Sequence, residues 1–367
     1  MKKLIFLSVT ISLFIFSCTN EKTSNVVEEE TVKTTLSDKV YTNSEVRHFL
    51  EKFPFIEKQV ELTPLKEIVP APYQLFKLDT ALIMVGASNS EHAASVWNAK
   101  DGSYIKSILP IGKGPGEYLP PLFCTFNGRT LSAYEESKKS FYRFTLSPQY
   151  DAELTYRSKE LLSPPPAYVY EIDSTSFLSI PRTEATRIMI YNNDCDLLYK
   201  GADFPDNMEQ NELSAAVKFF VYQGFCDIKP DKTKCAIVSV FTGNFEIYSL
   251  TDNKVEEVFA EEVSKSIKLE DYADTNDFQF AAVDRNHPRG FENLYAGEEF
   301  LYLLYIGKSD AEKESKFNPL LLKYDWEGKR IAAYKVDSKI QTFTIDEAEN
   351  KFYGIDANAE NLVTFEL

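Results

Sequence analysis

Short runs in which apolar and polar residues alternate recur along most of the chain. In the clearest example, the runs Cys235–Val240, Phe245–Leu250 and Val255–Phe259 are separated by turns that contain Gly, Asn or Asp. Alternation with a period of two, in runs rich in β-branched and aromatic residues, predicts strands rather than helices. The chain is therefore expected to be all-β.

These runs form a unit that recurs along the chain. In each copy a strand carries an aromatic residue near its end and is followed by a polar turn. The aligned aromatic residues are Trp97, Phe144, Tyr191, Tyr248, Tyr324 and Phe365. Their intervals are about 47, 47, 57, 76 and 41 residues, and a period of about 40–50 residues with three or four strands is typical of propeller blades. A pair of β-sandwiches with chance spacing is the alternative.

Two of these intervals are long enough to need insertions, which we place at residues 206–219 and 261–291. The first insertion has apolar residues at helical spacing, including Met208, Leu213 and Val217, and predicts a short helix.

The two ends of the repeat array are complementary. The sixth unit stops at Leu367, directly after its third strand, whereas a spare strand precedes the first unit at Val60–Val69. Because an open propeller would expose strand edges, we predict a six-bladed β-propeller whose ring is closed by this N-terminal strand pairing with the strand that ends at Phe365. A short helix is expected before it, because Thr42–Glu45 has the spacing of a capping box.

The N-terminus predicts export. Lys2 and Lys3 precede the apolar run Leu4–Phe16, and Ser17-Cys18 follows. About 13 apolar residues are few for a membrane span. The small residue before Cys18 resembles the lipobox of bacterial lipoproteins, which implies cleavage after residue 17 and lipidation of Cys18; an ordinary signal peptide is the alternative.

The predicted domains are therefore a signal peptide at 1–17, a polar flexible tether at 18–42 and the propeller at 43–367. A single lipid would anchor the protein to the bacterial cell envelope, at the periplasmic face or the cell surface.

The charge of the chain bears on its partners, and its cysteines and histidines bear on disulfides and metal sites. The formal net charge is -16, so nucleic acid is not an expected partner. We expect four separate buried thiols at Cys124, Cys195, Cys226 and Cys235. A disulfide between Cys226 and Cys235, which flank the turn 229–232, is the alternative. The few histidines do not cluster with cysteines, and no metal or cofactor is predicted.

Four segments of this sequence resemble one known family. They are Gly112-Lys113-Gly114-Pro115-Gly116-Glu117, Arg289-Gly290, Phe300–Lys308 and the turn Tyr324–Lys329. The chain resembles the TolB-like six-bladed propeller lipoproteins that are common in Bacteroidetes. The resemblance covers most of residues 70–367 and implies the fold, but it brings no catalytic residues.

Two loops carry the candidate binding residues. The glycine-rich loop 112–117 is followed by Pro120-Pro121 rather than by a helix, so it is not a nucleotide-binding loop. We expect a crossover between two blades, with Lys113 and Glu117 as candidate ligand contacts. In the second loop, Arg285, His287 and Arg289 could bind acidic groups at the channel mouth; a solvated loop with one paired arginine is the alternative.

The sequence contains no familiar catalytic motif. We expect a non-catalytic, membrane-anchored module that binds a ligand, either a glycan or a partner protein. The alternative is a glycan-acting lyase or hydrolase with a site at the propeller mouth. Several convergent acids, a histidine or a tyrosine at the mouth would favour the enzyme, whereas a flat, aromatic or featureless mouth would favour binding.

Overall fold

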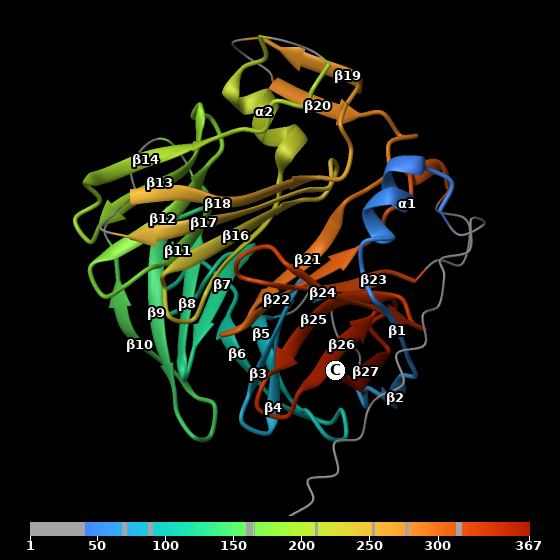
Figure 1. Ribbon diagram of the computed structural model, residues 1–367. Helices are drawn as coiled ribbons and strands as arrows, with labels where there is room; N and C mark the ends of the chain where they lie inside the picture. Colours follow the sequence, from blue (N-terminus) through green and yellow to red (C-terminus); the bar gives the residue numbers. More distant parts are fainter. Residues whose placement is uncertain are drawn as a thin grey trace, which may run out of the picture. The chain divides into compact units, whose positions relative to one another are not determined.

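The structure is a computed structural model that describes residues 41–67, 72–86, 91–158, 164, 166–209, 212–251, 254–275, 279–312 and 318–367. The predicted signal peptide, Cys18 and nearly all of the predicted tether lie outside these residues. The described part is almost entirely β (Figure 1). It has two short α-helices, α1 (Ser44–Leu50) and α2 (Ala215–Tyr222), and a 3₁₀ turn at Asp310–Glu312.

Six sheets form the blades of a β-propeller, each an antiparallel meander. Blade 1 consists of β3 (Gln74–Leu78), β4 (Ala81–Val85), β5 (His92–Asn98) and β6 (Tyr104–Pro110). Blade 2 consists of β7 (Leu122–Asn127), β8 (Thr130–Glu135), β9 (Ser140–Leu146) and β10 (Ala152–Arg157). Blade 3 consists of β11 (Pro166–Glu171), β12 (Ser176–Pro181), β13 (Thr186–Asn192) and β14 (Leu197–Asp203). Blade 4 consists of β15 (Gly224–Ile228), β16 (Lys234–Ser239), β17 (Asn244–Thr251) and β18 (Lys254–Glu262). Blade 5 contains β21 (Phe291–Ala296), β22 (Phe300–Tyr305), β23 (Leu320–Asp325) and β24 (Arg330–Val336). Blade 6 contains β25 (Ile340–Asp346), β26 (Lys351–Asp356) and β27 (Asn361–Glu366).

The aromatic residues that defined the repeat occupy one position in every blade. Trp97, Phe144, Tyr191, Tyr248, Tyr324 and Phe365 all lie on the third strand of their blade. The predicted six-bladed propeller is confirmed, and the β-sandwich alternative is wrong.

The N-terminal segment closes the ring as predicted. Strand β2 (Glu61–Pro64) pairs antiparallel with β27 and becomes the outer strand of blade 6, with Leu62 opposite Val363. Strand β1 (Phe55–Lys58) pairs parallel with β24 and adds a fifth strand to blade 5, which the sequence pattern did not predict. In Figure 1 the blue strands β1 and β2 therefore lie beside the red strands of the last blades.

Helix α1 confirms the predicted N-terminal helix, although its cap is one residue later than expected. The side chain of Asn43, rather than that of Thr42, accepts hydrogen bonds from the backbone N–H groups of Glu45 and Val46. Three residues of the helix are buried and pack with blades 4 and 5; they are Val46, Phe49 and Leu50. Tyr41, placed in the predicted tether, is also buried in this cluster.

The first insertion forms α2, which begins later than predicted and extends to Tyr222. The second forms a hairpin of β19 (Leu269–Asp274) and β20 (Gln279–Val283), which the polar sequence did not indicate. Val221, Ile267 and Leu269 form a small hydrophobic core that joins the two insertions.

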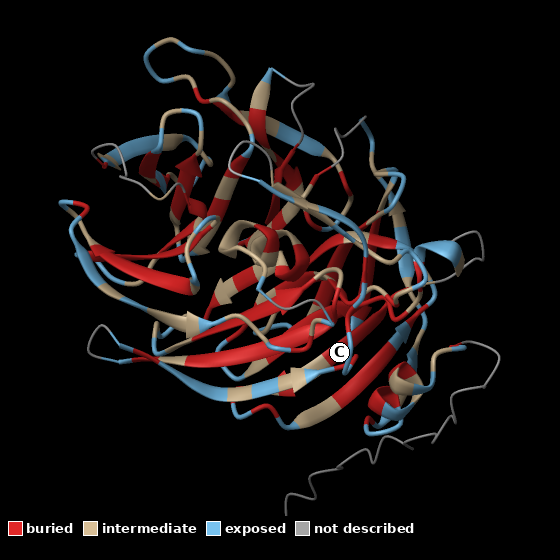
Figure 2. Ribbon diagram, turned by 90° about the horizontal axis from the view of Figure 1, so that it is seen from above, coloured by how far each residue is buried: buried red, intermediate tan, exposed pale blue. Residues whose placement is uncertain are grey.

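The hydrophobic core is divided among the six interfaces between neighbouring blades. One cluster of buried residues lies at each interface, and the cluster between blades 4 and 5 also includes the residues of α1. Figure 2 shows buried positions along the blade strands and exposed positions in many of the connecting loops. Since each blade buries both of its faces, stability depends on an unbroken ring.

The four described cysteines are buried and form no disulfide. Cys235 lies opposite Ile228, and Cys226 lies opposite Ile237, so the two residues are diagonal rather than directly paired. The alternative of a Cys226–Cys235 disulfide is wrong, and separate buried thiols are confirmed.

Candidate ligand-binding site

A cavity of about 490 Å³ is lined by the first strands of all six blades. Its volume lies within the range of about 300–1,000 Å³ that small-molecule pockets occupy. We call this cavity the central channel. Its aromatic lining residues are Tyr73, Phe76, Phe123, Phe126, Tyr168, Tyr170, Phe225, Tyr295 and Phe343.

The aromatic rings of blades 1 to 3, which we call the aromatic wall, pack in two groups. The ring centroids of Phe76 and Phe126 are 5.4 Å apart, and Phe123 meets Tyr168 edge to face at 4.6 Å. Packed rings hold one another in place, and their faces offer apolar surface to a flat ligand group.

Each first strand has a free inner edge, because it pairs with its own blade on one side only. Unpaired backbone N–H and C=O groups on that edge need partners when they are buried. The side-chain amide of Gln74, on β3, supplies a donor and an acceptor to the free edge of β7. Its Nε2 donates to the carbonyl of Cys124 at 2.8 Å, and its Oε1 accepts from the N–H of Cys124 at 2.8 Å. The Tyr73 hydroxyl lies 3.0 Å from both the N–H and the carbonyl of Leu122.

Similar links join the later blades around the channel. Tyr170 of blade 3 donates to the carbonyl of Cys226 in blade 4. Asp227 of blade 4 accepts from the N–H of Ala296 in blade 5 at 3.0 Å. These side-chain contacts between neighbouring first strands fix the shape of the channel before any ligand binds.

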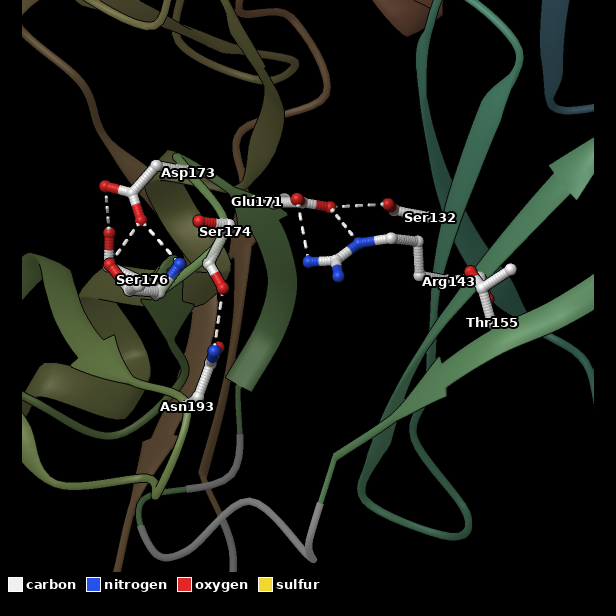
Figure 3. A network of polar contacts seen from close by, with 9 residues as sticks. Ser132, Arg143, Thr155, Glu171, Asp173, Ser174, Ser176 and Asn193 are labelled. Carbon is white, nitrogen blue, oxygen red and sulfur yellow. Dashed lines mark hydrogen bonds and ion pairs between the residues drawn. The ribbon is translucent and has the colours of Figure 1, made fainter.

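The charged group of Glu171 is neutralised across the interface of blades 2 and 3 (Figure 3). Arg143 binds its carboxylate with both arms of the guanidinium, at 3.0 Å from Nε and 2.8 Å from Nη2. The hydroxyl of Ser132 donates to the same carboxylate at 2.9 Å. Such a two-pronged contact holds Glu171 firmly in one orientation.

A second lining charge is paired between blades 1 and 6. The ammonium of Lys77 lies 3.1 Å from the carboxylate of Asp346, and both side chains are largely buried.

Comparison with known proteins agrees with this geometry. The sequence profile of the family described as TolB-like 6-blade propeller-like matches residues 51–348. The chain belongs to this family.

Two solved structures resemble this TolB-like propeller. One is a member of the DUF4221 family from Bacteroides vulgatus, with a TM-score of 0.57 and 10% identity, covering 84% of this chain and 96% of the other. The other is described as an exported protein of Bacteroides fragilis, with a TM-score of 0.51 and 11% identity, covering 84% and 97%. A search of curated proteins found no match. At these identities the likeness shows the fold alone.

The glycine-rich loop of this TolB-like propeller is the expected crossover, from β6 of blade 1 to β7 of blade 2. The carboxylate of Glu117 accepts the N–H of Gly114 at 2.7 Å and fills the space beside Gly112 where a side chain would otherwise lie. Lys138 donates to the carbonyl of Glu117 at 2.7 Å, whereas Lys113 is exposed. Glu117 thus helps to form the loop itself.

The second predicted group lies on the loop before β21. Arg285 is exposed, and burial lowers the pKa of His287 below its ordinary value. Arg289 lies 3.4 Å from Asp310 and 5.0 Å from the ring of Phe241, so the expected alternative of a paired arginine describes it. Neither loop contributes to the channel lining. The role of these five residues as ligand contacts stays a prediction.

The sequence analysis selected the two loops for their charged side chains and did not identify the residues that line the channel. A usable signal was present: polar residues interrupt first strands that are otherwise apolar. Gln74, Asp227 and Asn293 are examples, and each links neighbouring blades.

Within the residues that the structure describes, no three or more His, Cys, Asp or Glu side chains gather as metal ligands. The described helices include none long and apolar enough to cross a membrane.

Asp227 should make the stability of this TolB-like propeller depend on pH. Its two carboxylate oxygens accept the N–H groups of Ile228 and Ala296, and burial raises the pKa of Asp227 to about 6, with Lys232 opposing the rise. The unfolded value is about 3.9, so between about pH 4 and 6 the folded state holds a proton that the unfolded state has lost. The free energy of unfolding therefore falls as the pH rises through this range.

We expect that fall to reach about 2–3 kcal/mol relative to Asp227→Asn, because one pKa unit corresponds to about 1.4 kcal/mol. Urea denaturation of both proteins between pH 4 and 7 measures the difference. Glu366→Gln, at the exposed end of β27, is the control and should follow the wild-type curve. A pH-independent difference between wild type and Asp227→Asn would show that Asp227 does not titrate in this range.

Proposed function

We propose that this protein is a non-catalytic binding protein of the cell envelope that holds a small ligand with a flat apolar ring in the central channel. The aromatic wall carries this proposal. Rings from blades 1 to 5 line a cavity of small-molecule size, and Phe343 of blade 6 completes the circle. Cavities of this kind bind ligands by apolar contact, with a few polar groups fixing the orientation.

The state of the lining acids supports binding rather than acid–base catalysis. Glu171 is held by Arg143, Asp79 by Arg129, and Asp227 by two backbone N–H groups. Each of these carboxylates thus has a structural partner, whereas the aromatic rings of the lining contact one another. The lining thus holds aromatic rings, which the sequence analysis associated with binding, and tyrosines and acids, which it associated with an enzyme. The engaged state of the acids is what favours binding.

A channel-filling variant tests the proposal. Thr125 lies on the first strand of blade 2 and lines the cavity. We expect Thr125→Trp to weaken binding of the neutral fluorescent probe N-phenyl-1-naphthylamine at least tenfold, because the indole would occupy the space of the ring. Thr145→Trp is the matched control, since Thr145 is exposed on the third strand of the same blade.

Titration of the probe in the Cys18→Ser background, which needs no detergent, gives the affinities. Thermal unfolding with and without probe provides a second readout, because a ligand that binds only the folded state raises its stability. Absence of probe binding, or equal binding by wild type and Thr125→Trp, would contradict the proposal.

We further propose that the protein is exported and anchored by a lipid on Cys18. The positive residues, apolar run and Ser17-Cys18 junction support this, and one structural relative is described as an exported protein. A lipid on the tether would place the propeller beside the membrane without inserting it.

Replacing Cys18 with Ser should move the protein from the membrane fraction to the soluble fraction, because the thiol that carries the lipid is lost. The variant should also stop incorporating labelled fatty acid. Fractionation and labelling of cells that express both forms measure the two effects. Membrane association of Cys18→Ser at the wild-type level would refute the lipid anchor.

A further inference from the structure

Lys232 is a channel residue whose charge has no ion-pair partner among the residues that the structure describes. It lies in the turn between β15 and β16 and lines the channel. The other lysine of the lining, Lys77, is paired with Asp346. In the same turn as Lys232, Lys229 is paired with Asp231.

The carboxylate of Asp227, which also lines the channel, is engaged by backbone groups. Asp227 attracts Lys232 electrostatically, but both oxygens of its carboxylate accept backbone N–H groups. Asp227 therefore links blades 4 and 5, and the ammonium of Lys232 keeps its hydrogen-bonding capacity for another group.

The backbone at Lys232 does not favour a lysine. Its φ is 66°, in the left-handed region that glycine and asparagine adopt more easily than other residues. The N–H of Lys232 donates to the carbonyl of Lys229 at 2.8 Å, so the turn itself would tolerate either. The choice of lysine therefore adds a charge that the turn does not require.

We propose that the channel ligand is an organic anion, in which a flat ring lies against the aromatic wall and a carboxylate or sulfonate group pairs with Lys232. This inference rests on the proposed function. The turn that bears Lys232 follows a first strand, so Lys232 lines the end of the channel where the first strands lead into the second strands. A ligand between the rings would present its acidic group there. Because the protein carries a net charge of -16, its overall field does not attract anions, and selectivity must come from this local group.

A matched pair of probes separates this inference from the proposed function. N-phenyl-1-naphthylamine is neutral, and 8-anilino-1-naphthalenesulfonate has the same ring system with one sulfonate. We expect Lys232→Asn to weaken binding of the sulfonate about tenfold, as loss of one charge-assisted contact does, and to change binding of the neutral probe less than about twofold.

Three comparisons complete the experiment. Lys232→Arg keeps the charge and should retain sulfonate binding. Lys254→Asn removes an exposed lysine outside the channel and should leave both affinities unchanged. Thermal unfolding should show that Lys232→Asn is at least as stable as wild type, since asparagine suits the backbone at this position.

The outcomes separate the anion assignment at Lys232 from the proposed channel site. If both probes bind but Lys232→Asn leaves the sulfonate affinity unchanged, or weakens both probes equally, the anion assignment is wrong and the channel site stands. If neither probe binds wild type, the proposed function fails and the anion assignment fails with it.

Discussion

Deletion of residues 44–64 should abolish cooperative unfolding of the propeller. This segment supplies the outer strand of blade 6, the fifth strand of blade 5 and the buried face of α1. Without it, the edges of β24 and β27 would be open, and exposed strand edges promote association between molecules. The ring would also lose the contacts by which its last two blades are tied to the N-terminus.

Urea denaturation followed by circular dichroism and tyrosine fluorescence measures this effect. The wild type should unfold in one transition at the same urea concentration by both methods. The deleted protein should aggregate or unfold gradually. Removal of residues 24–38 is the control, since it shortens the predicted tether and leaves α1, β1 and β2 intact. A sharp transition at the wild-type midpoint after removal of 44–64 would disprove closure by the N-terminal strands.

The second large effect is expected at Arg187. Its Nη1 lies 2.6 Å from Oε1 of Glu246, and the two side chains are only 3% and 4% exposed. Arg187 lies on β13 and Glu246 on β17, so the ion pair joins blades 3 and 4. Removal of one member of a buried pair leaves an uncompensated charge, which typically costs about 3–5 kcal/mol.

Arg187→Met should therefore lower the free energy of unfolding by about 3–5 kcal/mol, whereas the double variant Arg187→Met/Glu246→Met should recover most of the loss. The second carboxylate oxygen of Glu246 is buried without a hydrogen-bond partner, which adds to the cost of leaving this charge alone. Denaturation of the four members of this mutant cycle gives the coupling energy. If the single and double variants are equally destabilised, the loss comes from packing and not from the charge.

The architecture was predictable because its determinants are local and repeated. Alternating strands, polar turns and an aromatic residue near the end of the third strand, such as Tyr248 or Phe365, recur in each blade. Closure followed from counting strands at the two ends of the array. The parallel pairing of β1 with β24 has no comparable signal, because each strand carries only a short run and their pairing spans most of the chain.

The channel could not be predicted in the same way. Its wall is assembled from one strand of every blade, so residues such as Phe76 and Tyr295 line one cavity only after the ring has closed. Sequence reasoning instead selected charged loop residues, including Arg285 and Arg289, for their chemical reactivity. The polar residues inside first strands, such as Gln74 and Asp227, could have located the channel once the blades were aligned.

The most direct test of the proposed channel site is to locate a bound ring by crystallography. Crystals of the protein soaked with a bromine-labelled N-phenyl-1-naphthylamine would show the ring through the anomalous signal of bromine. The account predicts a peak inside the channel, close to the rings of Phe76, Phe126 and Tyr168. Bromine found only at sites outside the channel would contradict it.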